Sequence, residues 1–464
     1  MMAPRRYMRT ALCLPISQAM THSELLGRLK LGVRRTVAIY PFLLGSLRVD
    51  PCDERKNSLV IDTPKDPLDI ARGSIIVSPK YWADRMDYDS LEGRGFPPSQ
   101  IADAIVRDPH DPVDVKDGCP VFNLQVVFIR NGIILSICLH HSLADGPTFS
   151  EVVENIISGL DQEPVSADPV IGFHLHLDSF ESTLETGDPQ ELIKLCPDRM
   201  FRDEMERTTE LLRQPLDLIP PVRCKIFQYD LSSLLGIRIE ILNAMTNAQT
   251  SGHLASANDC IGAYLWAHVT RARLANKPPS AKPKESRLFV PVDFRPRIKP
   301  KVPQTYFGNA IITVPVTMSI SVLIAACGAF NSYNGKRALA KVALAIREAS
   351  DAVNEEYIRR RLNLGKSLPD MRAVRLNFNA IGTIDVIFNN LAALDAGLTK
   401  STFAARQSKR IAMRPLATDM AANVGVMLPR LDSVVELVLG LYEDDMEELL
   451  ATKSWMRLVK QIIE

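Results

Sequence analysis

The sequence predicts an α/β protein built from two halves. Strand-like and helix-like segments are mixed along the whole chain, which at 464 residues is longer than one ordinary domain. An acidic, irregular stretch near the middle is followed by Pro215, Pro220 and Pro221, a composition typical of a connection between domains. We therefore expect an N-terminal domain at residues 1–195, a crossover at 196–222 and a C-terminal domain at 223–464.

The N-terminal half begins with a strand over 11–16 and a helix over 24–44, in which apolar residues recur at helical spacing until Gly45. Short strands are expected at 57–61 and 73–77. The Pro-, Asp- and Gly-rich stretch 78–120 predicts loops and short helices.

A β-hairpin follows. Two β-rich runs, 122–130 and 133–139, flank Asn131-Gly132, a pair that favours a two-residue type I′ turn. The second strand runs directly into His140 and His141. An amphipathic helix is expected after Pro147, so the two histidines lie at a strand-to-helix junction.

The second half repeats this mixture of strands and helices. A helix at 200–212 precedes it, and its own expected helices span 259–275 and 337–362, with a closing helix from 444 onward. Expected strands lie at 288–292, 311–316, 384–388, 424–428 and 434–440.

Composition excludes several classes of function. A net charge of +1 gives no reason to expect a nucleic acid or an anionic membrane as partner. Nothing approaches 18 uninterrupted apolar residues, so no membrane span is predicted. The eight cysteines form no Cys-x-x-Cys pair, and a reducing, cytoplasmic setting fits them. G-x-S-x-G, Walker A and G-x-G-x-x-G motifs are absent from the sequence.

The stretch His140 to Gly146 is suited to proton transfer. An imidazole at the end of a rigid strand can accept a proton from an attacking alcohol, because its unperturbed pKa is about 6.5. Gly146 allows the sharp turn that follows Asp145. His141 is therefore the candidate general base.

Several segments resemble one enzyme family. His141 to Gly146 matches the H-x-x-x-D-G motif of the coenzyme A-dependent acyltransferase superfamily. Segments 256–259, 292–297 and 306–310 resemble the BAHD acyltransferases, in particular their fungal branch of trichothecene acetyltransferases. The resemblance extends over nearly the whole chain.

This resemblance implies a fold of two similar chloramphenicol-acetyltransferase-like domains with a channel between them. It implies that His141 deprotonates a hydroxyl or amine of a small secondary metabolite, and that acyl-CoA is a co-substrate with no permanently bound cofactor or metal. Asp145 would pair with Arg295 and brace the turn rather than relay protons. The protein is expected to act as a monomer.

One motif departs from the family pattern. The Asp-Phe-Gly-Trp-Gly segment of the family corresponds here to 395–399, where Asp395 and Gly397 are kept but Ala396 and Leu398 replace the aromatic residues. Together with Ser256 and Asn309, Asp395 and Gly397 are the candidate CoA contacts. Three interpretations stay open: ordinary acyl transfer with a remodelled loop, a condensation-like enzyme with a different donor, and a non-catalytic binding protein.

Two further clusters have alternative interpretations. His174, His176 and Asp178 resemble a metal cluster but lack further ligands, and a place in the segment that joins the two halves fits them better. Two basic segments either contact CoA phosphates or serve solubility; their residues are Lys277, Lys282, Lys284, Arg287, Arg297, Lys299 and Lys301.

Overall fold

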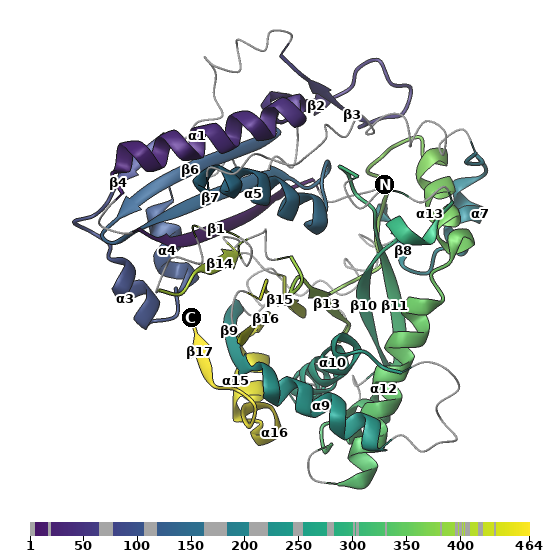
Figure 1. The fold of residues 1–464 in the computed structure, drawn as a ribbon. Coiled ribbons are helices and arrows are strands. Elements are labelled where there is room, and N and C mark those ends of the chain that lie inside the picture. The colour runs from purple at the N-terminus through teal and green to yellow at the C-terminus, as the bar shows by residue number, and fades with distance from the viewer. Residues whose placement is uncertain are drawn as a thin grey trace.

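The computed structural model has two sheets, each with its own helices and hydrophobic core (Figure 1). It describes residues 5–16, 20–64, 78–105, 118–161, 183–203, 221–244, 254–275, 283–299, 302, 306–329, 332–380, 383–394, 398, 401, 403, 409–415, 421–430 and 433–464. None of the helices within these ranges combines the length and apolar character that crossing a lipid bilayer demands.

The N-terminal sheet has five strands in the order β14-β1-β7-β6-β4. Helices α1 and α5 pack against each other and share the core of this sheet. Their backbones come very close, because a Cβ on Gly32 would lie 2.2 Å from the Ile156 carbonyl oxygen. The elements of this half are β1 (Tyr7–Pro15), α1 (His22–Ile39), η1 (Pro41–Leu44), β2 (Ser46–Val49), β3 (Leu59–Asp62), β4 (Ser78–Tyr81), α3 (Tyr88–Gly93), α4 (Pro98–Ala104), β5 (Cys119–Pro120), β6 (Phe122–Ile129), β7 (Gly132–His140), α5 (Gly146–Asp161), α7 (Pro189–Lys194) and β8 (Arg199–Phe201).

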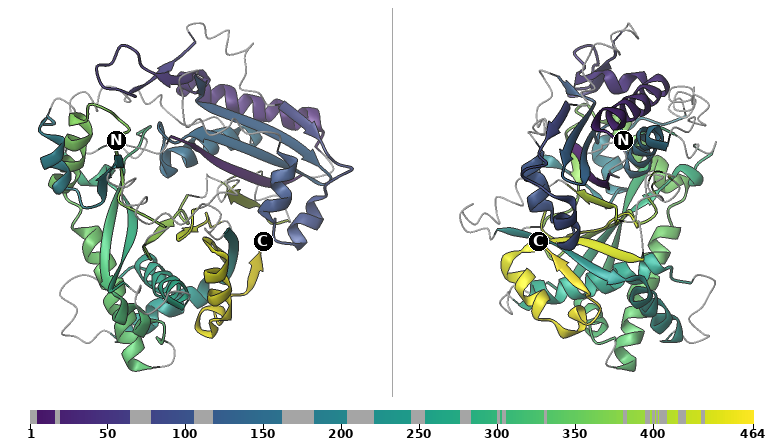
Figure 2. Two further views of the ribbon diagram at one scale, coloured as in Figure 1. Left: turned by 180° about the vertical axis from the view of Figure 1, so that it is seen from behind. Right: turned by 60° about the vertical axis from the view of Figure 1, so that its left-hand side comes forward.

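The C-terminal sheet has seven strands in the order β11-β10-β13-β15-β16-β9-β17. Helices α9, α10, α11, α12, α15 and α16 contribute to its core (Figure 2). Its elements are β9 (Val222–Asp230), α9 (Leu231–Ala244), α10 (Ala257–Ala275), β10 (Glu285–Asp293), η4 (Arg295–Arg297), β11 (Ile311–Ser319), α11 (Ile320–Ala326), α12 (Tyr333–Asp351), α13 (Glu355–Ser367), β12 (Val374–Leu376), β13 (Val386–Asn390), β14 (Ala412–Pro415), β15 (Val424–Met427), β16 (Val434–Tyr442), α15 (Glu443–Ala451), α16 (Lys453–Met456) and β17 (Gln461–Ile463).

Two short strand pairings join the halves. Strand β14 follows β13 in the chain but pairs with β1 at the edge of the N-terminal sheet. Strand β8, inside the predicted crossover, pairs with β12. The chain therefore passes between the two units more than once, and the domain boundaries at 195 and 222 stay a prediction.

The hairpin turn differs from the expected type I′ turn. Gly132 pairs with Ile129 as the first residue of β7, so the two loop residues are Arg130 and Asn131, of which only Asn131 has a positive φ, at 60°. Asparagine tolerates this left-handed conformation. A Cβ at position 132 would lie 2.3 Å from the Tyr88 ring, so Gly132 serves close packing rather than the turn.

Three predicted helices were wrong in extent or type. The helix expected over 24–44 ends at Ile39, and a 3-10 helix follows from Pro41. The helix expected over 337–362 divides into α12 and α13, because the Asn354 side chain accepts a hydrogen bond from the Tyr357 amide and starts a new helix. The helix expected over 200–212 starts in strand β8, and its residues 204–212 lie outside the described part, as does the strand expected at 73–77.

Candidate active site

A cavity of about 710 Å³ lies between the two halves. Its N-terminal side is formed at the end of β7 and the start of α5, where His141, Asp145 and Gly146 line it. Its C-terminal side is formed by residues of β10, β11 and β13 and by Asn309. The size suits one small-molecule ligand.

His141 is held in place by hydrogen bonds to two backbone carbonyl oxygens. Its amide donates to the Arg6 carbonyl oxygen at 2.8 Å, which extends the pairing of β7 with β1. Its Nδ1 lies 2.9 Å from the Ala144 carbonyl oxygen, which can only accept, so Nδ1 carries the proton. The unprotonated nitrogen is therefore Nε2, the one able to accept a proton.

The surroundings of His141 favour its neutral form. Burial lowers the pKa of the imidazole below its usual 6.5, and the nearby positive charge of Arg6 lowers it further. A neutral imidazole at pH 7 is the form that a general base requires.

His140 lies on the other side of the strand. It is fully buried, meets the Tyr7 ring edge to face at 5.2 Å between centroids, and its Nδ1 accepts from the Ser142 amide at 3.3 Å. Consecutive strand residues point to opposite faces, so only His141 of the pair lines the cavity.

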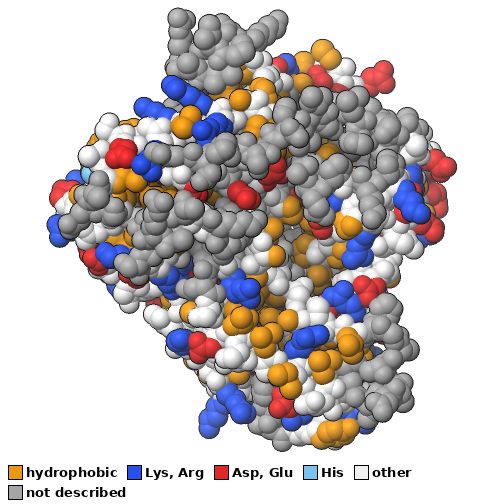
Figure 3. Space-filling model, in the orientation of Figure 1, with side chains coloured by type: hydrophobic (Ala, Val, Ile, Leu, Met, Phe, Trp, Pro, Cys, Tyr) orange, Lys and Arg blue, Asp and Glu red, His pale blue; other side chains and the backbone are white. Residues whose placement is uncertain are grey.

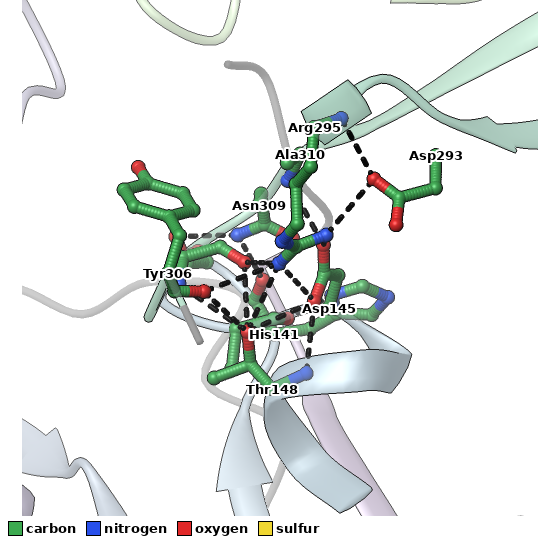
Figure 4. Close-up of polar contacts among 11 residues, drawn as sticks. His141, Asp145, Thr148, Asp293, Arg295, Tyr306, Asn309 and Ala310 are labelled. Carbon is green, nitrogen blue, oxygen red and sulfur yellow. Dashed lines mark hydrogen bonds and ion pairs between the residues drawn. The ribbon is translucent and has the colours of Figure 1, made fainter. Parts of the chain in front are cut away.

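Asp145 and Arg295 form a buried ion pair behind the turn. Arg295 Nη1 lies 2.9 Å from Asp145 Oδ2, and the two side chains are 0% and 2% exposed. Arg295 also lies 3.2 Å from Asp293, so its guanidinium stands between two carboxylates (Figure 4). Asp145 Oδ1 caps α5 by accepting from the Thr148 amide at 3.1 Å, and Oδ2 accepts from the Ala310 amide at 2.9 Å.

Thr148 connects this ion pair to the segment before β11. Its hydroxyl lies 3.0 Å from Asp145 Oδ1 and 3.1 Å from the Gly308 carbonyl oxygen, and Arg295 donates to the same carbonyl at 3.2 Å (Figure 4). Sequence reasoning did not single out Thr148, although its position three residues after Asp145 is that of a helix-capping partner.

Asn309 holds the histidine turn from the opposite half. Its side-chain amide donates to the His141 and Ser142 carbonyl oxygens at 3.0 and 3.1 Å. Gly146 lies against the residues that follow β13, because a Cβ there would lie 3.0 Å from Leu394 Cδ1 and 3.5 Å from Leu391 Cδ2. Both residues line the cavity.

Of the other predicted CoA contacts, Ser256 is described, and it is not brought to this cavity. Ser256 is not among its lining residues; its hydroxyl lies 2.6 Å from Asp259 Oδ2 at the start of α10 and accepts from Arg347 at 2.9 Å. Asp395 and Gly397 lie outside the described residues, as do His174, His176 and Asp178.

The two basic segments are partly described. Arg287 pairs with Asp385, with 2.6 Å between Nη2 and Oδ2, and Arg297 donates to the Val353 carbonyl oxygen at 3.2 Å. Neither residue lines the cavity, and neither do Lys284 and Lys299. Lys277, Lys282 and Lys301 lie outside the described residues.

The site therefore offers a neutral imidazole beside a cavity, and a rigid turn that fixes its position. Within the described ranges, no group of three or more His, Cys, Asp or Glu side chains is placed to hold a metal ion. This arrangement can remove a proton from a hydroxyl or amine that lies against Nε2.

Comparisons with known proteins agree along the whole chain. Residues 96–374 match the model of the Transferase family, and residues 6–158 match that of the trichothecene 3-O-acetyltransferase-like N-terminal domain. The chain is 23% identical to the trichothecene 8-O-acetyltransferase of Fusarium sporotrichioides, over 97% of this chain and 95% of that protein. It is also 23% identical to the eremophilane O-acetyltransferase ORF8 of Penicillium roqueforti, over 98% and 96%.

A solved structure has the same fold. F. graminearum TRI101 complexed with coenzyme A and deoxynivalenol superposes with a TM-score of 0.78 at 17% identity, and the match covers 100% of this chain and 98% of that one. The prediction of an acyltransferase-type α/β fold is confirmed by this likeness.

Proposed function

This chain belongs to the Transferase family, and on that premise we propose that it transfers an acyl group from acyl-CoA to a hydroxyl of a small secondary metabolite. Its fungal relatives carry the names of O-acetyltransferases, and TRI101 was solved with coenzyme A and a small-molecule acceptor. The observation that carries the proposal is the neutral His141 at the wall of the cavity, with its Nδ1 proton directed to Ala144.

The proposed reaction moves one proton and one acyl group. His141 Nε2 takes the proton of the acceptor hydroxyl as its oxygen attacks the thioester carbon. The tetrahedral intermediate then collapses and the carbon–sulfur bond breaks. The departing thiolate takes the proton from the imidazolium. The products are an ester and free CoA thiol, and the imidazole returns to its neutral form.

In this proposal Asp145 stabilises the turn and takes no part in proton transfer. Both of its oxygens are occupied by Arg295, Thr148 and the Ala310 amide, whereas Nδ1 of His141 donates to a backbone carbonyl. A proton relay of the serine-protease kind would need the carboxylate at Nδ1.

Release of free thiol from acetyl-CoA in the presence of a panel of alcohols tests the proposal. We expect turnover by the native protein and its loss by about 100-fold to 10,000-fold in His141→Ala. The matched control is His22→Ala, an exposed histidine in α1 that does not line the cavity. Equal turnover in His141→Ala and the native protein would refute the role of His141.

The donor is tested separately by calorimetry with CoA. Measurable binding of free CoA supports acyl-CoA as the donor. If CoA does not bind, and acyl transfer requires a carrier-protein thioester, the condensation-like alternative replaces the proposal.

A further inference from the structure

Arg6 lies directly opposite His141, where the antiparallel pairing of β1 with β7 ends. Tyr7 pairs with His140 in this register, and the His141 amide donates to the Arg6 carbonyl oxygen at 2.8 Å, so the register continues by one residue. Residues opposite each other in such a pair point to the same face, with Cβ atoms about 4.5–5.5 Å apart. The Arg6 and His141 side chains therefore start side by side.

The two faces of this pairing have different surroundings. Tyr7 and His140 are both buried, and their rings meet edge to face at 5.2 Å between centroids. Arg6 and His141 point the other way, and both line the cavity. The backbone contact between these two residues is thus also a pairing of their side chains at the proposed reaction site.

The Arg6 side chain is not engaged by another described residue. Within the described part of the chain it makes no ion pair and donates no hydrogen bond, and Arg6 is exposed. Asp145 and Asp293 are the described carboxylates that line the cavity, and both pair with Arg295. The guanidinium of Arg6 is therefore available to an anion that forms in the cavity.

By itself this cation disfavours proton uptake by His141. After burial, the charge of Arg6 lowers the pKa of the imidazole, because it repels the proton that the imidazole takes up. Asp145 opposes this effect, but its carboxylate is bound by Arg295 and the Ala310 amide. An arginine beside a general base therefore assists the reaction only if a negative charge forms nearby in the same step.

Acyl transfer produces such a charge. As the acceptor oxygen gives its proton to His141 Nε2, it bonds to the thioester carbon, and the carbonyl π electron pair moves onto the carbonyl oxygen. This oxyanion is two bonds away from the atom that lies at Nε2, so it forms next to the imidazole. Preorganised donors and charges at a developing oxyanion lower the barrier of such a reaction.

Other donor side chains at the histidine turn are already engaged. Asn309 lines the cavity, but its amide donates to the His141 and Ser142 carbonyl oxygens. Arg295 is fully buried and binds Asp145 and Asp293. Arg6 differs from both, because its fork of N–H groups has no described acceptor.

The Arg6 charge is not part of a generally positive surface. The chain as a whole carries +1, and on the face seen in Figure 3 blue and red side chains are interspersed between the grey residues. General attraction of anions to the protein therefore does not account for a cation beside the base.

We propose that Arg6 is a second catalytic residue, whose guanidinium stabilises the oxyanion of the tetrahedral intermediate while His141 holds the proton. When the intermediate collapses, the electron pair returns to the carbon–oxygen bond, the carbon–sulfur bond breaks, and the thiolate takes the proton from the imidazolium. Arg6 donates hydrogen bonds and transfers no proton. This inference rests on the proposed acyl transfer and adds a residue to its mechanism.

The test measures kcat and KM with acetyl-CoA and an alcohol, at pH values where His141 is neutral in every variant. Arg6→Met should lower kcat about 100-fold and leave KM nearly unchanged, because the lost interaction exists only in the transition state. Arg6→Gln is the second neutral variant, and Arg6→Lys, which keeps the charge without the planar fork, should recover part of the loss. Arg34→Met is the matched control, an exposed arginine of α1 that does not line the cavity.

Chemical rescue distinguishes a role in the reaction from a role in folding. Millimolar guanidinium chloride should raise the kcat of Arg6→Ala about 10-fold, because the free cation can bind beside the oxyanion. Urea at the same concentration has a similar shape but no charge and should have no effect, and guanidinium should not rescue His141→Ala. Absence of rescue together with no recovery in Arg6→Lys would mean that the loss is structural, and the inference would be overturned.

Other roles of Arg6 give different results. If the kcat of Arg6→Met is reduced at low pH and native where His141 is neutral, Arg6 only sets the protonation of His141 and the inference is overturned. If the KM for acetyl-CoA rises at unchanged kcat, or calorimetry shows weaker binding of free CoA, Arg6 holds the donor in the ground state and the inference is overturned as well. Native kcat at every pH in Arg6→Met has the same consequence.

The native protein separates this inference from the proposed function. If it releases thiol with an alcohol, the acyl transfer stands and the Arg6 variants decide the inference alone. If it releases thiol only by slow hydrolysis of acetyl-CoA, and Arg6→Met loses this activity, the alcohol acceptor fails and the oxyanion assignment stands. If it releases no thiol by either route, both are overturned.

Discussion

Replacing Asp145 by Asn should reveal what the buried ion pair does. The change keeps the shape of the side chain and removes its charge, which leaves the fully buried Arg295 guanidinium with Asp293 as its remaining described carboxylate partner, at 3.2 Å. Breaking a buried pair by removing one partner costs about 3–5 kcal/mol. Because the Asp293 side chain is 31% exposed and offsets part of the charge, we expect the lower end, about 3 kcal/mol.

The same change should also slow the reaction. Asparagine can still cap α5 through its one carbonyl oxygen, but its NH2 group cannot accept from the Ala310 amide, so the turn that carries His141 loses this contact together with the ion pair. A displacement of about 1 Å at a reacting group can cost about 100-fold in rate. We therefore expect kcat/KM to fall by about 10-fold to 100-fold together with the stability.

Urea unfolding and thiol release measure the two effects, and a double-mutant cycle with Arg295→Met separates the pair from its surroundings. We expect the double variant to be less destabilised than the sum of the single ones, by about 2 kcal/mol. The control is Asp293→Asn, which removes the more exposed partner and should cost about 1 kcal/mol or less. A 10,000-fold loss of rate at unchanged stability would mean that Asp145 relays protons. Unchanged stability together with unchanged rate would refute the proposal that Asp145 stabilises the histidine turn.

Three further outcomes are expected. The kcat/KM profile should fall on its acid side with a midpoint below pH 6.5, because burial and Arg6 lower the pKa of His141; a midpoint at or above 6.5 would contradict this. Asn309→Ala should lower kcat and reduce the free energy of unfolding by about 1–3 kcal/mol, because two hydrogen bonds to the histidine turn are lost. A native kcat in this variant would show that the turn keeps its position without Asn309. Glu436→Gln should cost about 3–5 kcal/mol, because the buried Glu436 of β16 pairs with the fully buried Arg414 of β14 at 2.6 Å across the two sheets. Burial raises the pKa of Glu436, but Arg414 outweighs it and the pKa is lowered from 4.5, so the carboxylate stabilises the fold above about pH 4.5 and this contribution is lost as the pH falls through the lowered pKa. Urea unfolding between pH 3 and 7 should therefore show the two proteins converging in acid, and a constant difference would contradict the assignment.

Local signals in the sequence predicted most elements and the central motif. The strand that carries the histidines, helix α5 and strands β10, β11, β15 and β16 were expected from periodicities of two and of 3.6 residues, which depend on neighbours in the chain. His141, Asp145 and Gly146 lie within six residues of one another, so their arrangement at one turn follows from a strand that ends and a helix that begins.

Errors arose where short elements depend on distant partners. The four-residue strand β14 has little pattern of its own and exists because it pairs with β1, some 400 residues earlier. Strand β8 likewise depends on β12, and the predicted helix at 200–212 begins inside it. Gly132 was assigned to the turn from its residue type, whereas the Tyr88 ring decides its place.

The sequence by itself placed His141, the proposed general base, at a strand-to-helix turn, because the residues of that turn are consecutive in the chain. Only the tertiary structure decided what faces this base. The Asn309 bonds to the turn, the Ala310 amide at Asp145 and the Arg295 partner of Asp145 all come from segments far from the turn in the chain, and their distances depend on how the two sheets pack. Side-chain periodicity carries no information about such contacts, since they are made between elements and not within them.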